Sequence, residues 1–214
     1  EMLDLPGLSD EAREIGLSLV TTTVRDRYLM YLKTNYKVPG SVLDRDDMAR
    51  AEIEVRKRMA RGARLLRRHV PGFEKAFMAR SSPSLCIRRG RRITCDYDIT
   101  HDDVIEGRHF EDDVFAYGFH DMAPRFQIKD GGTYGIPYRA LCVTGIDNLY
   151  AAGMMITSDH RAHMSTRNTV SCMGQGQATG TAAALCAERE LGSRDLPMTT
   201  LRDALIQGGV YFEA

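Results

Sequence analysis

The longest stretch of the chain without a charged residue runs from Asn168 to Ala187 and is crowded with glycine, alanine and other small residues. It is long enough for a helix to cross a bilayer, but its Gln, Thr, Ser and Gly content is far too polar for that environment. The pattern predicts a small-residue helix from about Met173 to Leu191, closed by Gly192. Such a helix lets another backbone approach closely, which constrains how the chain can pack.

Two interpretations of this helix stay open. Its opening at Gly174 and Gly176 leaves unpaired N–H groups and a positive dipole end, which favour an anion or a flat cofactor. Alternatively, the helix packs closely on a sheet through Gly176, Gly180, Ala183 and Ala184. The glycine spacing itself is no dinucleotide fingerprint, because no strand leads directly into it and no acidic residue ends a following strand.

The overall composition is that of a soluble globular protein of 214 residues, with 43% hydrophobic and 27% charged residues. Twenty-nine basic residues balance twenty-nine acidic ones, so no overall field points to nucleic acid or to an anionic membrane. Five cysteines without a CxxC pair predict reduced thiols. With no charged-then-apolar leader in the sequence, we expect a cytoplasmic protein.

The clearest helix runs from about Asp46 to His69, where apolar or small residues recur at helical spacing. Acidic residues at its start and basic residues at its end suit the helix dipole. Its outer face is rich in arginine, which we interpret as a solvated face partly paired by Glu52 and Glu54 rather than as a nucleic-acid patch. Before it, Thr21 to Val24 has the β-branched content of a strand.

Further along the chain the pattern changes to strands and turns. Alternation from Ser84 to Ile99 predicts two strands around Arg89-Gly90. A short strand is expected at Ala140 to Thr144, and a fully buried one at Leu149 to Gly153. The last predicted element is an amphipathic helix from about Thr199 to Gln207.

Four motifs follow one another in the second half of the chain: Tyr134-Gly-Ile-Pro-Tyr-Arg139, Asp147-Asn-Leu-Tyr-Ala-Ala-Gly153, Ser158-x-His160-x-Ala162-x-x-Ser165-x-Arg167 and Gly174-Gln-Gly-Gln-Ala-Thr-Gly-Thr-Ala-Ala-Ala184. Upstream lie Arg50-Ala-Glu-Ile-Glu54, Val70-Pro-Gly-Phe73, Arg88 with Arg91-Arg92-Ile93, Tyr97-x-Ile-Thr100, Asp102-Asp103-Val104 and His120-Asp121. In this order the series resembles the C-terminal half of FAD-dependent oxidoreductases of the glutathione-reductase-like superfamily, in the branch with an IPYR segment. The resemblance runs from about residue 35 to the C-terminus.

This resemblance implies an α/β fold with an α+β cap. The chain would be the C-terminal portion of a two-domain FAD-binding flavoprotein, without the N-terminal dinucleotide-binding βαβ unit. Residues 1–135 would form the substrate or cap portion, and residues 136–214 the C-terminal segment of the FAD-binding domain. The implied partner is a chain or segment carrying the N-terminal GxGxxG half, which we expect to lie outside these 214 residues.

The implied cofactor is FAD, held by two parts of the C-terminal segment. Gly153 and Met154 would end a strand beside the ribityl and pyrophosphate region, and Ser165 is a further expected contact. A second group of contacts comes from the helix opening, whose dipole would point at the flavin pyrimidine edge and stabilise the reduced flavin. This second group is Gly174, Gln175, Gly176, Gln177 and Ala178.

The resemblance also suggests which residues carry the reaction, a hydride transfer between flavin and a small polar or carbonyl-containing substrate. His160 suits a proton-transfer role near neutral pH. Arg167 and Arg139 could hold a carboxylate or stabilise an enolate through bidentate hydrogen bonds. Tyr138 completes the expected catalytic set.

Arg88 and Arg91 are outer candidates that would line the substrate pocket. No metal is expected, because His160 and His163 have no third ligand at a suitable spacing. We also expect neither nucleic acid nor membrane as a partner, and we expect activity only with the missing half or a partner subunit in a hetero-oligomer.

Structural roles compete with several of these assignments. Arg139 could pair with Asp147 or with another acid. Cys172 could be a redox thiol or a small buried apolar residue. His120-Asp121 could orient a base or stabilise a turn.

Two residues depart from the pattern of the family branch. Arg89 stands where an acidic residue is usual, and Cys95 stands where glycine is usual. These departures motivate a second hypothesis, a non-catalytic structural subunit that retains the flavoprotein fold. A nucleic-acid binder built on the arginine-rich helix is a third and weaker hypothesis.

Overall fold

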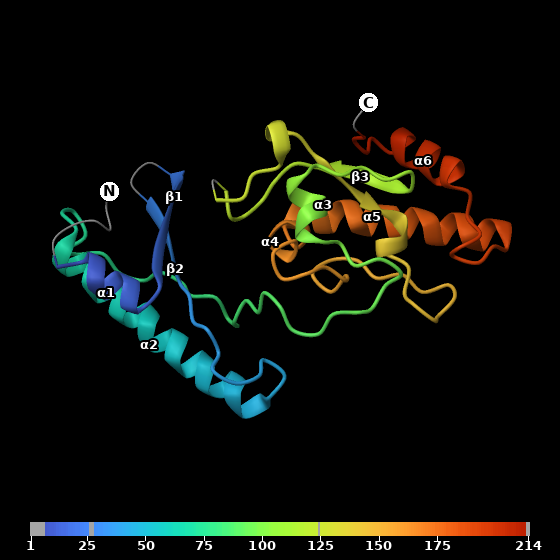
Figure 1. Ribbon diagram of the computed structural model, residues 1–214. Helices are drawn as coiled ribbons and strands as arrows, with labels where there is room; N and C mark the ends of the chain where they lie inside the picture. The colour runs from blue at the N-terminus through green and yellow to red at the C-terminus, as the bar shows by residue number, and fades with distance from the viewer. Residues whose placement is uncertain (1–6, 26–27, 124, 213–214) are drawn as a thin grey trace. The chain divides into compact units, whose positions relative to one another are not determined.

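A computed structural model describes residues 7–25, 28–123 and 125–212 of the chain. The chain divides into two compact units, Glu1–Ile87 and Arg88–Ala214. Each unit has its own hydrophobic core (Figure 1). None of the described helices combines the length and the apolar character that a membrane crossing requires.

The first unit is a β-hairpin accompanied by two helices. Strands β1 (Leu17–Arg25) and β2 (Tyr28–Thr34) pair antiparallel, between α1 (Ser9–Glu14) and the long α2 (Arg45–His69) in the chain. The core of this unit consists of Leu8, Ala12, Ile15, Leu17, Leu65, Leu66 and Val70. The expected strand character of residues 21–24 is confirmed, because they lie in β1.

Helix α2 confirms the helix predicted over residues 46–69. Asp44 caps its N-terminus, where the carboxylate accepts the backbone N–H groups of Asp46 and Asp47 at 2.9 Å each. On the outer face Arg56 pairs with Glu52 and Arg58 with Glu54. The predicted pairing of these arginines is therefore confirmed.

The second unit combines a small sheet with helices, so the fold is of the mixed α+β kind. Strands β3 (Asp113–Tyr117) and β4 (Tyr134–Pro137) pair antiparallel, and helix α5 contacts both β3 and α6 (Figure 1). The core gathers residues from the sheet and from both helices, including Val114, Ile136, Ala182 and Leu201. The elements are α3 (His101–Ile105), β3, η2 (Lys129–Gly131), β4, η3 (Tyr138–Ala140), α4 (His163–Thr166), α5 (Thr169–Arg189) and α6 (Met198–Gln207).

All the strands that the sequence predicted in the second unit are wrong. Residues 84–99, 140–144 and 149–153 contain isolated bridges only, such as Cys95 with Val143. Around residues 89–95 the side chains of Arg89 and Arg92 bind the carbonyl of Ser158, and the N–H of Cys95 donates to the Thr157 hydroxyl, so no strand ladder forms. The 149–153 segment is flanked by residues with positive φ, and its Leu149 is 43% exposed, which excludes a fully buried strand.

The two C-terminal helices were predicted with different success. Helix α6 confirms the expectation for residues 199–207. Helix α5 exists, but it begins at Thr169, a full turn before the predicted start at Met173. It ends at Arg189, followed by Glu190 in the left-handed conformation (φ 55°), before the expected stop at Gly192. The predicted boundary between the cap portion and the FAD-binding segment, at residues 135 and 136, stays a prediction. The boundary between the two compact units falls after Ile87 in the sequence.

Replacement of Gly135 by alanine tests the packing of the small sheet. The new Cβ would lie 1.8 Å from Asp113 Oδ2, and this buried carboxylate already binds Phe110 N at 3.1 Å and His109 Nδ1 at 2.9 Å. We expect G135A to lower the free energy of unfolding by about 2 kcal/mol or more, as measured by urea denaturation.

G180A is the matched control, because nothing lies within 4 Å of a Cβ at this helical position. It should stabilise the chain by up to about 1 kcal/mol, the gain in helix propensity from glycine to alanine. Equal effects of the two substitutions would contradict the close contact at Gly135.

Candidate functional site

The segment of residues 153–168, which contains α4, is joined to helix α5 by one buried side chain. Gln175 is fully buried. Its Oε1 accepts the N–H of Gly153 at 2.7 Å, and its Nε2 donates to Thr166 O at 2.9 Å and to Ser171 Oγ at 3.1 Å. A single amide therefore holds both ends of the 153–168 segment against the first turns of α5.

The N-terminus of α5 lacks a side-chain cap. Asn168 occupies the N-cap position, but its Nδ2 donates backwards to Met164 O and Ser165 O, and no side-chain oxygen accepts from the first turn. A helix of 21 residues thus presents the positive end of its dipole without a capping oxygen. Beside this end lie exposed apolar side chains, Val170 at 67% and Met173 at 68% exposure.

The exposed face of α5 carries the glycines. The buried residues follow helical spacing on the opposite side, at Ser171, Gln175, Ala178, Ala182 and Cys186. Within the described residues, α5 does not pack on a sheet through Gly176, Gly180, Ala183 and Ala184, since all four are exposed. The close approach falls instead at Gly174, where a Cβ would lie 3.0 Å from the Phe115 ring.

The residues expected to bind the cofactor fall into two groups. Ser165, Gln175 and Ala178 are buried. Ser165 donates to Phe119 O and bonds to Tyr134 at 2.8 Å. The others lie at the surface or close to it: Gly153, Met154, Gly174, Gly176 and Gln177. Because α5 starts at Thr169, residues 174–178 lie in its second and third turns, and the predicted helix opening at Gly174 is corrected to Thr169.

His160 and Arg167 lie in the 153–168 segment but differ in exposure. The ring of His160 is exposed. Arg167 follows α4, its side chain is only 8% exposed, and it forms an ion pair with Asp121. Asp121 therefore forms an ion pair with an arginine. The neighbouring His120 accepts the N–H of Met122 at 3.0 Å.

Tyr138 and Arg139 are bound to other parts of the second unit. The Tyr138 hydroxyl donates to Ser193 O at 2.7 Å and lies 2.6 Å from the Tyr150 hydroxyl. Arg139 pairs with Asp112, so its partner is an acid other than Asp147, and it stacks over the rings of Tyr97 and Phe110. These contacts are structural ones, and the catalytic assignment of both residues stays a prediction.

Both arginines expected at the substrate pocket are exposed, at Arg88 and Arg91. The backbone carbonyl of Arg88 accepts a hydrogen bond from His163 Nε2 at 2.8 Å. His163 thus binds the backbone of the segment that contains Arg88. Cys172 lies within α5, and its thiol contacts Arg167 O at 3.3 Å. Within the described ranges, no group of three or more histidine, cysteine or acidic side chains could hold a metal.

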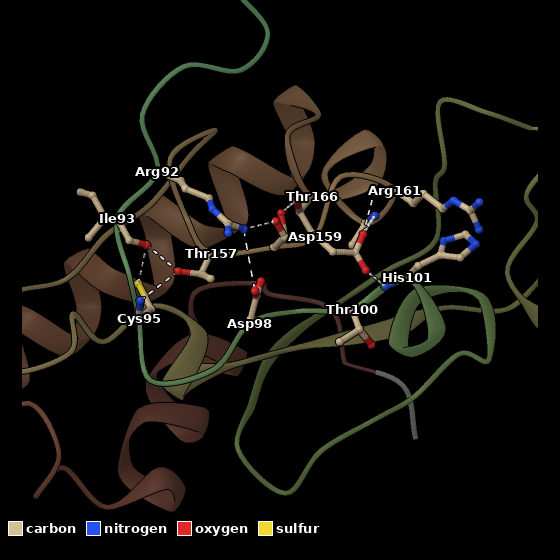
Figure 2. A network of polar contacts seen from close by, with 12 residues as sticks. Arg92, Ile93, Cys95, Asp98, Thr100, His101, Thr157, Asp159, Arg161 and Thr166 are labelled. Atoms are coloured by element: carbon tan, nitrogen blue, oxygen red, sulfur yellow. Dashed lines mark hydrogen bonds and ion pairs between the residues drawn. The ribbon is translucent and has the colours of Figure 1, made fainter. Parts of the chain in front are cut away.

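Sequence reasoning missed the polar network that holds the 153–168 segment from outside. Figure 2 shows Asp159 beside His101 and Arg161, and Arg92 beside Asp98. One feature of the sequence could have indicated this network. Asp159 lies in a polar loop, and an aspartate there commonly accepts backbone N–H groups two or three residues ahead.

A long helix with an uncapped start, next to a firmly held loop and an exposed glycine face, is the kind of site that binds an anionic cofactor. Comparison with protein families then identifies the class. Residues 6–205 match the model of the FAD dependent oxidoreductases, and the chain belongs to this family. Searches of curated proteins and of solved structures found no match.

FAD fits the residues present at the start of α5. The uncapped N–H groups there offer donors to an electron-rich acceptor. Gly153 has φ 89°, and nothing lies within 4 Å of a Cβ placed on it, so a flat or chain-like group can approach this backbone closely.

Replacement of Gln175 by leucine tests the buried amide. The change leaves the N–H of Gly153 and the carbonyl of Thr166 without their partner, and we expect a loss of about 2–3 kcal/mol in the free energy of unfolding. Q177L is the control in the same helix, because exposed Gln177 makes one bond, to Gly208 O, and should cost about 0.5 kcal/mol. Urea denaturation of both variants measures the difference, and equal losses would contradict the role of Gln175.

Two buried histidines predict a pH dependence. Burial lowers the pKa of His120, and the nearby His101 lowers it further. Burial also lowers the pKa of His163, more than its bond to Arg88 O raises it. Because the unfolded chain binds protons more readily at these positions, the free energy of unfolding should fall between about pH 7.5 and about pH 5.5.

Urea denaturation at the two pH values measures this fall. H120Q, which cannot titrate, should show a smaller fall than the unchanged chain. Stability that stays constant or rises on acidification would contradict the neutral state of both rings.

Proposed function

We propose that the chain is the C-terminal part of an FAD-dependent oxidoreductase of the glutathione-reductase-like superfamily, in its IPYR branch. It transfers hydride between flavin and a small polar or carbonyl-containing substrate. The observation that carries this proposal is the uncapped start of α5, fixed by Gln175 against the Gly153 turn, in a chain that belongs to the FAD dependent oxidoreductases.

The residues that would hold FAD surround this helix start. The N–H groups of the first turn, at residues 169–171, would face the flavin pyrimidine edge, and Gly153 with Met154 would border the ribityl chain. When bound, FAD supplies the hydride acceptor or donor. The protein contributes a fixed positive dipole end, which favours the negative charge of reduced flavin.

The partner in this proposal is the N-terminal GxGxxG half of the FAD domain, on another chain or segment. The exposed face of α5 supports it, since Met173, Gly176, Gly180, Ala183 and Ala184 are exposed and uncharged. Without Cβ atoms at its glycines, this face allows another backbone to pack closely. We propose that it covers the βαβ unit in a cytoplasmic hetero-oligomer or in a longer polypeptide.

In the proposed reaction His160 moves the proton. Its exposed ring, on a backbone held at both sides, can reach a bound substrate and exchange a proton with water. Arg167 is compensated by Asp121, so it acts by orienting the site rather than as a free anion receptor. The exposed Arg88 and Arg91 are then the better candidates to bind a substrate carboxylate.

The non-catalytic alternative rested on the two departures from the family pattern. Arg89 binds the carbonyls of Ser158 and Asp159, and Cys95 is buried, with its N–H bound to Thr157. The Arg89 side chain therefore supports the 153–168 segment, and Cys95 does so through its backbone N–H alone. This observation favours the oxidoreductase over the non-catalytic subunit.

The test is the visible spectrum of the chain purified with the partner that carries the GxGxxG half. We expect bound flavin absorbance. H160A should retain this absorbance while turnover falls by about 100-fold or more, the usual contribution of a general acid or base. No flavin band, even with added FAD, would contradict the cofactor. Unchanged turnover of H160A would remove His160 from the proton role, and bound flavin with no turnover on any carbonyl substrate would favour the structural subunit.

A further inference from the structure

The backbone that follows His160 is bound by the carboxylate of Asp159. One oxygen accepts the N–H groups of Arg161 at 2.7 Å and of Ala162 at 2.8 Å. The other accepts the N–H of His101, at the start of α3, at 2.5 Å (Figure 2). Asp159 therefore closes the turn that contains His160 and ties it to α3.

The backbone of Asp159 itself is also bound. Its N–H donates to Ile99 O at 3.0 Å, and its carbonyl accepts the N–H of His163, also at 3.0 Å. A residue that uses its carboxylate, its N–H and its carbonyl in this way has little freedom to rotate. These bonds to Asp159 fix where the backbone of the next residue, His160, begins.

Two arginines hold the same turn from the opposite side. Arg92 donates to Ser158 O at 2.9 Å, and Arg89 donates to Ser158 O at 3.1 Å and to Asp159 O at 3.3 Å. Hydrogen bonds from charged donors are stronger than neutral ones. The carbonyls before His160 and the N–H groups after it are thus both occupied, while its ring stays exposed.

The charge of the Asp159 carboxylate is itself held by this arrangement. Burial would raise the pKa of Asp159, but the N–H groups of Ala162, His101 and Arg161 together keep it below its ordinary value. The carboxylate is therefore ionised at neutral pH and accepts all three N–H bonds at once.

We infer that Asp159, with Arg89 and Arg92, forms a clamp that positions His160 for proton transfer. The clamp is a set of positioning residues, since none of the three has to touch the substrate. It rests on the proposed function for the role of His160. The Arg89 departure from the family pattern becomes part of the positioning apparatus.

The test compares D159A and D159N with D147N, whose carboxylate is highly exposed and pairs with Arg194. Amide hydrogen exchange is measured by NMR on the chain. We expect the Arg161 and Ala162 amides to exchange at least about tenfold faster in D159A, because their acceptor is lost. D159N retains one acceptor oxygen and should lie between D159A and the unchanged chain. D147N should leave both rates unchanged.

Turnover is measured on the flavin-loaded assembly. In D159A we expect kcat to fall by about 100-fold, the scale of a misplacement near 1 Å, with KM little changed and flavin absorbance retained. Far-UV circular dichroism identifies a variant that fails to fold, and D159N then carries the comparison.

The outcomes separate the clamp from the proposed function. Unchanged exchange of the Arg161 and Ala162 amides in both Asp159 variants overturns the clamp, even if H160A is inactive. Faster exchange with unchanged turnover overturns the positioning role. A missing flavin band overturns the proposed function, and turnover that survives in H160A removes His160 from the proton role, whatever the exchange rates show.

Discussion

The buried amide of Gln175 is the interaction on which the second unit depends. Its three hydrogen bonds join Gly153, Thr166 and Ser171, which lie 22, 9 and 4 residues before it along the chain. A buried amide without partners would be costly, so the loop must close whenever α5 packs into the core. Helix packing and loop geometry are therefore set together.

Several charged side chains of this unit bind backbone groups. Arg89 and Arg92 bind loop carbonyls, and Asp159 binds N–H groups, so charged side chains take the place of a strand ladder. In the proposed function, the exposed histidine of this segment and the uncapped start of α5 would serve the cofactor chemistry. Rigidity on one side of the segment and exposure on the other are what a proton-transfer loop requires.

The sequence predicted the elements whose signals are local. Helix α2 was predicted within one residue because its apolar spacing and its charged ends agree, and α6 because its apolar residues share one face. Strands were predicted wrongly at residues 84–99, where alternation was present but Arg89 and Arg92 bind the carbonyls of residues 158 and 159, and the N–H of Cys95 donates to the Thr157 hydroxyl. The start of α5 was misplaced, because the glycines suggested an opening that Asn168 provides earlier. His160 and Arg167 could be proposed from a motif, but the partner of Arg167, Asp121, lies 46 residues away along the chain.

The separation of the two hydrophobic cores has a consequence for cooperativity. Residues 70–94, between α2 and the second unit's first bridge, contain no helix or strand, and each unit buries its own apolar residues. Two cores of this kind unfold as two transitions rather than one, so each unit has its own free energy of unfolding, and the substitutions proposed above act on that of the second unit. The melting of α2 would report on the first unit, and the buried tyrosines around Tyr134 and Tyr138 would report on the second.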